Sequence, residues 1–113
     1  MTLEELINQT DEITKNKILP IINYITSNYK VTYDSKFSER TLIPTFRLGS
    51  SYVAIGCRKH YISIYFSNRE AVNIITNNYI YCRGQKSCVN FSYKRDLPLE
   101  AICNAVDLCL ASN

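Results

Sequence analysis

The chain has 113 residues, of which 46% are hydrophobic and 20% are charged, and its formal net charge is +3. This composition is typical of one globular domain and excludes a disordered tail or a fibre. No apolar run approaches the ~18 residues that a membrane-spanning helix needs, and the acidic start, Met1–Glu5, lacks the apolar segment of a secretory leader. We therefore expect a single cytoplasmic domain over residues 1–113, without membrane contact.

The thirteen Lys and Arg are spread along the chain, and the densest basic clusters are the pairs Arg58-Lys59 and Lys94-Arg95. Domains that bind nucleic acid usually gather a stronger basic excess on one face, so the charge disfavours nucleic acid as a partner. The five cysteines are an odd number without a Cys-x-x-Cys pair. This pattern favours reduced thiols and disfavours a zinc site.

Residues 2–29 carry the pattern of helices. Thr2 and Glu5 have the spacing of a capping box, which predicts a helix start. Pro20 suits a helix only in its first turn, so we expect the second helix to begin shortly before it. The N-terminal part then forms either two helices with a break near residues 14–16 or one kinked helix. The apolar stripe of the second helix has helical spacing and comprises Ile18, Ile21, Ile22, Ile25 and Tyr29.

The middle of the chain has the pattern of an antiparallel sheet. Residues 31–40 mix polar and small side chains, which predicts a loop with at most a short strand. Two β-type runs, 45–48 and 52–55, flank Gly49 and predict a hairpin. Residues 61–66 then alternate and predict a third strand, with isoleucines on one face and tyrosines on the other.

The last third of the chain alternates helix and strand signals. Ser67–Glu70 is a second capping box, which predicts a helix to about Asn77. A turn at Gly84 and a strand over residues 87–93 follow, and Pro98 suits the first position of a closing helix. The order predicts an α+β fold: an antiparallel sheet of about four to five strands, with N-terminal helices, a crossover helix and a C-terminal helix packed on it.

Three blocks in a fixed order carry a family resemblance: Pro44-Thr45-Phe46 with Gly49, the run 59–65, and the run 85–91 followed by 97–102. Together they resemble the YdhG-like domain family of small bacterial proteins, which mostly lack a known biochemical role. The resemblance is clearest over residues 44–111. It implies a YdhG-like fold and, since some members are described as frataxin-like iron chaperones, metal or iron handling. Iron is the one cofactor it suggests.

The candidate metal ligands are His60, Glu5 and Glu12. His60 is the only histidine and stands where the family usually has Asn, and Cys57 is close enough in sequence to be a second ligand. Glu5 and Glu12 are seven apart and could share a helical face as a cation-binding ridge. The alternatives are a solvated histidine in a polar turn and acidic residues that only stabilise a helix N-terminus, and the net positive charge disfavours the acidic ridge.

The candidate partner-binding residues gather around the turn before the third strand. They comprise Arg58, Lys59, His60, Tyr61, Tyr65 and Lys86. Tyr61 and Tyr65, with Tyr52 across the hairpin, could stack on a ligand or a partner, unless helices cover that face and make the rings part of the core. Cys88 could be a thiol activated by Lys86, with a buried structural thiol as the alternative.

No phosphate-binding loop, zinc-protease motif or nucleophile with an adjacent base is visible in the sequence. We therefore expect a non-enzymatic protein that binds a small ligand or a protein partner. The first hypothesis for its role is metal or iron handling, as in frataxin-like relatives. The alternative is a protein- or nucleic-acid-interaction module that uses the tyrosine-lined sheet face and the basic rim of the hairpin.

Overall fold

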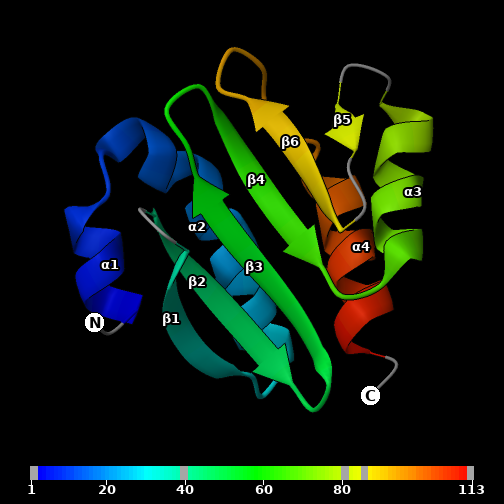
Figure 1. Cartoon of the computed structure of the whole chain (residues 1–113), viewed down its shortest axis with the longest axis horizontal. Helices are drawn as coiled ribbons and strands as arrows, with labels where there is room; N and C mark the ends of the chain where they lie inside the picture. Colours follow the sequence, from blue (N-terminus) through cyan, green and yellow to red (C-terminus); the bar gives the residue numbers. More distant parts are fainter. Residues whose placement is uncertain (1–2, 39–40, 80–81, 85–86, 112–113) are drawn as a thin grey trace.

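The structure is a computed structural model that describes residues 3–38, 41–79, 82–84 and 87–111. It confirms the predicted α+β fold, with helices packed on an antiparallel sheet (Figure 1). In the described residues the helices are α1 Leu3–Gln9, α2 Glu12–Asn28, α3 Arg69–Asn78 and α4 Leu99–Leu110. None of them combines the length and apolar character that crossing a bilayer requires.

Within the described part of the chain, the sheet contains five strands of five or more residues and one very short strand. The strands are β1 Thr32–Ser38, β2 Thr41–Leu48, β3 Ser51–Cys57, β4 Tyr61–Phe66, β5 Arg83–Gly84 and β6 Cys88–Ser92. Their order across the sheet is β1-β2-β3-β4-β6-β5, and all neighbours are antiparallel. The predicted four to five strands are therefore present, and β5 adds a sixth of two residues.

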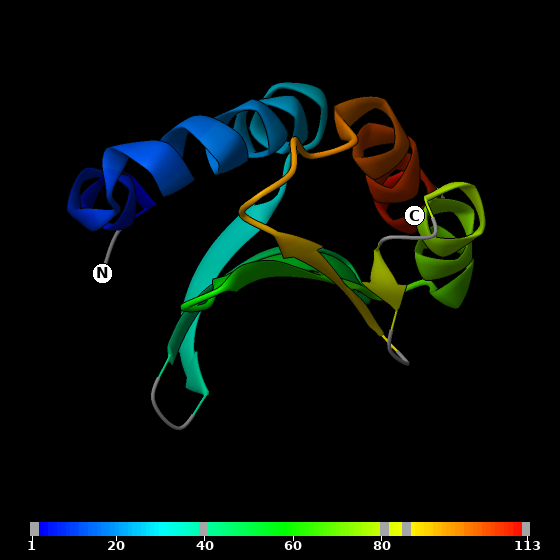
Figure 2. The same ribbon diagram turned by 90° about the horizontal axis from the view of Figure 1, so that it is seen from above.

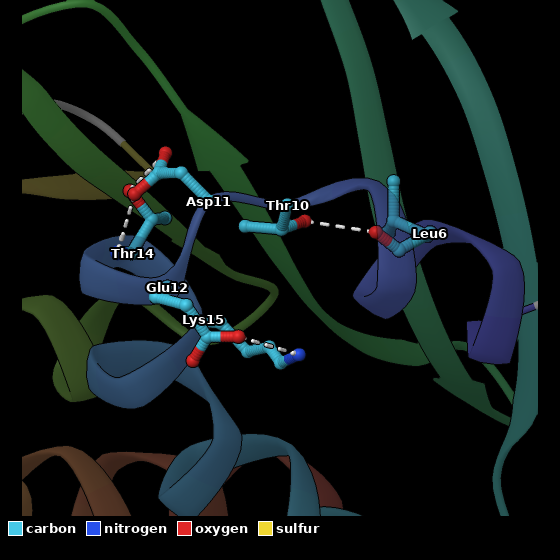
Figure 3. A network of polar contacts seen from close by, with 6 residues as sticks. All are labelled: Leu6, Thr10, Asp11, Glu12, Thr14 and Lys15. Carbon is cyan, nitrogen blue, oxygen red and sulfur yellow. Dashed lines mark hydrogen bonds and ion pairs between the residues drawn. The ribbon is translucent and has the colours of Figure 1, made fainter.

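The first two helices are separated at Thr10 and Asp11, earlier than the predicted break at 14–16. Asp11 is the N-cap of α2: its carboxylate accepts from the Thr14 amide at 2.9 Å and from the Thr14 hydroxyl at 3.0 Å (Figure 3). The hydroxyl of Thr10 turns back and donates to the carbonyl of Leu6 at 2.8 Å. A side chain that satisfies the first amides fixes where a helix begins, so this cap sets the start of α2.

Pro20 lies inside α2 and not in its first turn, so that prediction was wrong. Proline removes one helical hydrogen bond and crowds the preceding turn. The helix nevertheless continues because the apolar stripe on its other residues is buried, with Ile21 and Ile25 fully inaccessible to solvent. Thr2, the first residue of the predicted capping box, lies outside the described residues.

Strand β1 replaces the loop predicted over 31–40. It pairs with β2 in a regular register that runs from Thr32 opposite Arg47 to Ser38 opposite Thr41. Five of the seven residues of β1 are polar, and the prediction gave too much weight to them. Tyr33 packs on Phe46 with 5.7 Å between ring centroids, which ties the strand to the core.

The central hairpin and the strand after it agree with the sequence pattern. Gly49 has a φ of 62° at the turn between β2 and β3, a left-handed conformation that glycine adopts without strain. Strand β4 has the bounds that the alternation predicted, and Ile62 and Ile64 are fully buried.

Helix α3 begins one residue later than the capping box suggested. The N-cap is Asn68, whose side-chain oxygen accepts from the amide of Glu70 at 2.9 Å. Gly84, predicted as a turn, pairs instead with Val89 in the short strand β5. These changes are local: β5 adds a short strand between α3 and β6, and the predicted helix and strand on either side of it remain.

The helices lie on one side of the sheet and leave the other side without a helical cover (Figure 2). The core forms between the two layers and is contributed by every second strand residue, including Val53, Ile55, Ile64 and Val89, all fully buried. Helices α2 and α4 are also joined by a polar contact. The Asp107 carboxylate accepts from the hydroxyls of Tyr24, at 2.9 Å, and of Tyr29.

Candidate functional site

The uncovered face of the sheet carries the tyrosines that the sequence singled out. Tyr65 lies opposite Ala54, and Tyr61 lies opposite Ser92, on the face away from the buried isoleucines. Tyr61 is 40% exposed and Tyr65 is half-buried. The alternative in which helices cover these rings is therefore wrong, since the described helices pack on the opposite face (Figure 2).

Arg58 reaches back from the β3–β4 turn onto this uncovered face. Its Nη2 donates to the Tyr65 hydroxyl oxygen at 2.6 Å. A Cβ placed on Gly56 would lie 3.5 Å from both Arg58 Nε and Tyr65 Cε2, so the guanidinium and the ring pack directly beside this glycine. The hydrogen bond to Tyr65 holds the guanidinium in this position beside Gly56.

The backbone of Arg58 is fixed from two directions. Its amide donates to the carbonyl of Tyr61 at 2.9 Å, which closes the turn. Its carbonyl accepts from the hydroxyl of Tyr93 at 2.9 Å. Lys59 and His60 are at the tip of the same turn, and His60 is exposed. The structure thus brings five predicted residues to one rim and one face: Arg58, Lys59, His60, Tyr61 and Tyr65.

Buried polar groups of β4 and β6 continue the face beside Arg58. Ser63 is 3% exposed and its hydroxyl donates to the Asn90 side-chain oxygen at 2.7 Å. Cys88 is 5% exposed; burial raises the pKa of its thiol, and the nearby charge of Arg58 opposes that rise. The sequence did not point to Gly56, Ser63 or Asn90, because only the strand register places them around Arg58.

A second arginine stands on the β2 part of the same face. The Arg47 guanidinium carbon lies 5.7 Å from the centroid of the Tyr52 ring, within cation–π range. Its Nε is 3.9 Å from an Asp34 carboxylate oxygen, and both side chains are about two-fifths exposed. Tyr52 therefore belongs to the face, as predicted, with Arg47 as a neighbour that the sequence analysis missed.

An open cleft of about 400 Å³ adjoins the rim on the helical side. It lies where the N-terminus of α2 meets the β3–β4 turn. Its lining comprises Asp11, Ile13, Thr14, Arg58, Lys59 and Tyr93. Arg58 and Lys59 thus belong to both the rim of the uncovered face and this cleft.

The candidate metal ligands come from different elements of the fold. Glu5 is on α1 and Glu12 is on α2, where it pairs with Lys15 at 3.2 Å, so the predicted shared helical face does not form (Figure 3). Burial raises the pKa of Cys57, the suggested partner of His60, to about 11. Among the described residues, no three His, Cys, Asp or Glu side chains gather where a metal would fit. Lys86 lies outside the described residues.

Comparison of the chain with known protein families, with curated proteins and with solved structures finds no match. The resemblance to YdhG-like proteins therefore stays a prediction.

Proposed function

We propose that the protein is a non-enzymatic binding module whose uncovered sheet face and β3–β4 rim bind an acidic segment of a partner protein. The observation that carries the proposal is Arg58, held by the Tyr65 hydroxyl beside Gly56. A guanidinium group that is fixed before binding loses little entropy when it meets a carboxylate, which it can bind through two parallel hydrogen bonds.

The surroundings of Arg58 support a protein segment as the partner. Tyrosines and arginines are the residues most enriched where protein interfaces concentrate their binding energy. The face offers Tyr61, Tyr65 and Tyr52 with Arg58 and Arg47. A nucleic acid fits less well, because the net charge is only +3 and Asp34 offsets part of the charge of Arg47.

Metal or iron handling, implied by the YdhG-like resemblance, is the first hypothesis from the sequence and the second candidate function. Glu5, Glu12 and His60 remain its candidate ligands. No feature of the described residues favours it over the binding module.

The proposal is tested with a fluorescein-labelled oligo-glutamate peptide, titrated with the full chain and followed by fluorescence anisotropy. Arg58→Gln should weaken binding roughly tenfold or more, as loss of a central charged anchor does. Tyr65→Phe keeps the ring but removes the acceptor that positions Arg58, and should weaken binding by a smaller factor. Lys15→Gln removes one positive charge from the helical layer, and should leave the affinity within about twofold of wild type.

Two results would overturn the proposal. One is equal loss of binding in the Arg58 and Lys15 variants, which would indicate a response to net charge alone. The other is tighter, Arg58-dependent binding of a single-stranded oligonucleotide with no binding of the peptide, which would assign the face to nucleic acid.

A further inference from the structure

Strand β1 is the terminal strand of the sheet, and no strand in the described part of the chain pairs with its outer side. It spans seven residues and contains no proline. An edge of this kind presents a row of backbone amides and carbonyls that can pair with another strand. Edge strands often carry charges that prevent such pairing, so the order of charges along β1 decides between protection and pairing.

The sequence of β1 is complementary to itself when it is reversed. About Ser35 as the centre, Asp34 matches Lys36, Tyr33 matches Phe37, and Thr32 matches Ser38. In an antiparallel pair of two such strands, each acidic position would stand opposite a basic one, and each aromatic position opposite an aromatic one. Opposite charges and aromatic pairs directly across antiparallel strands stabilise the pairing.

Only one register has this property. In an antiparallel pair, two residues directly opposite each other both direct their backbone N–H and C=O groups toward the other strand, or both direct them away from it. Since this direction alternates along a strand, two identical strands can pair only when the same residue of each copy lies at the two-fold axis. A centre at Asp34 places two carboxylates opposite each other, and a centre at Lys36 places two ammonium groups there. The centre at Ser35 avoids both like-charge contacts.

We propose that β1 pairs antiparallel with β1 of a second copy of this chain, with Ser35 on the two-fold axis. The result is a symmetric dimer in which the two sheets join into one. Charge complementarity favours a second copy as the partner, since Asp34 lies opposite Lys36 of the other copy twice in every dimer. A parallel pairing in register would instead place Asp34 opposite Asp34 and Lys36 opposite Lys36.

The first experiment exchanges charges and measures mass by sedimentation, up to about 500 μM because strand-edge interfaces are small and bind weakly. The wild-type chain should dimerise. Lys36→Asp and Asp34→Lys should each raise the dissociation constant about tenfold or more, since each creates two like-charge contacts per dimer. The double variant that carries both exchanges should restore the wild-type constant.

An equal mixture of the two single variants provides the control for folding. Each variant repels itself, because positions 34 and 36 are both acidic in Lys36→Asp and both basic in Asp34→Lys. In a mixed pair, each acidic position of one chain meets a basic position of the other. A mixed dimer should therefore form at concentrations where both variants alone are monomers. A folding defect in the single variants would not allow dimers to form again in the mixture or in the double variant.

A second experiment tests the register with a cross-link. Ser35→Cys places two thiols opposite each other across the axis, at the roughly 4.5–5.5 Å Cα separation of an antiparallel pair, which a disulfide can span. Mild oxidation should yield a covalent dimer. Thr32→Cys is the matched control, because its two copies would lie about six residues apart along the strands, roughly 20 Å.

The inference is overturned if the wild-type chain stays monomeric over the whole concentration range. It is also overturned if the charge exchanges leave a dimer unchanged, or if Thr32→Cys cross-links as readily as Ser35→Cys.

Discussion

Gly84 and Gly56 both lie within strands, but the space beside them differs. A Cβ on Gly84 would be 2.5 Å from the Thr76 methyl carbon Cγ2, whereas the nearest atoms to a Cβ on Gly56 are at 3.5 Å, an ordinary contact. Thr76 cannot easily rotate away, because its hydroxyl donates back to the carbonyl of Val72 at 3.1 Å. Glycine at position 84 is therefore required by the close packing of β5 on α3.

Gly84→Ala should destabilise the fold by about 1–3 kcal/mol, the usual cost of forcing an extra methyl group into a packed site. Gly56→Ala should change the stability by less than about 1 kcal/mol, since its methyl group meets Arg58 and Tyr65 without overlap. Urea denaturation of both variants measures the difference. Equal stabilities would show that β5 moves away from α3 at little cost.

The candidate binding residues could be predicted from the sequence by type but not by arrangement. Arg58 and Lys59 were found because they are the basic pair in a turn between strands. Their relation to Gly56 and Ser63 depends on which residues of β3 and β4 lie opposite each other, and the turn alone does not determine that register.

At the scale of elements, α2 depends on its N-cap. Asp11 accepts from the backbone amide and then the hydroxyl of Thr14, and these bonds lower the pKa of its carboxyl group below the ordinary value of 3.8. Because the pKa of Asp11 is lower in the folded state, its ionised carboxylate stabilises the fold fully when the pH is above the ordinary pKa. This stabilisation is lost as the pH falls through the folded-state pKa.

Asp11→Ala should lower the melting temperature at neutral pH, and the difference from wild type should shrink in acid as the wild-type carboxylate is protonated. Asp11→Ser is the matched control, since serine also caps helices but does not titrate. Thermal denaturation followed by circular dichroism at several pH values measures both. A serine variant as unstable as the alanine variant would contradict a capping role.

The elements themselves were largely predictable where their patterns were regular. The alternation over 61–66 gave β4 with its bounds, and Pro98, the N-cap of α4, indicated where the closing helix begins. The prediction failed for α2 because Pro20 was treated as a start signal and the Asp11–Thr14 cap was not recognised. It failed for β1 because most of its residues are polar, and the contact that ties the strand to the core joins Tyr33 to Phe46, which belongs to the next strand.

At the scale of the whole molecule, the helical layer is held together by packing and by the bonds of Tyr24 and Tyr29 to Asp107. The hydrogen bond to Asp107 raises the pKa of Tyr24, and burial followed by the same carboxylate raises the pKa of Tyr29. With folded-state pKa values above the ordinary value of 10.0, this stabilisation is complete below pH 10 and is lost as the pH rises through the raised values.

Asp107→Asn should destabilise the fold by about 1–2 kcal/mol at neutral pH, because two charge-assisted hydrogen bonds are weakened at a half-buried site. It should also lower the pH at which the tyrosines ionise, as measured by ultraviolet absorption of tyrosinate. Asp96→Asn makes the same change at an exposed position before α4 and should alter neither quantity. An unchanged tyrosine titration in Asp107→Asn would contradict the role of this carboxylate.

The double attachment of Arg58 has a spectroscopic consequence. Its side chain donates to Tyr65 on the uncovered face, and its carbonyl accepts from Tyr93 on the helical side. The chain has nine tyrosines and no tryptophan, so its intrinsic fluorescence is that of phenol rings alone. Two of those rings, Tyr65 and Tyr93, are hydrogen-bonded to Arg58, the residue proposed to bind the partner. The molecule therefore carries its own unlabelled optical probe at the point where binding is expected to occur.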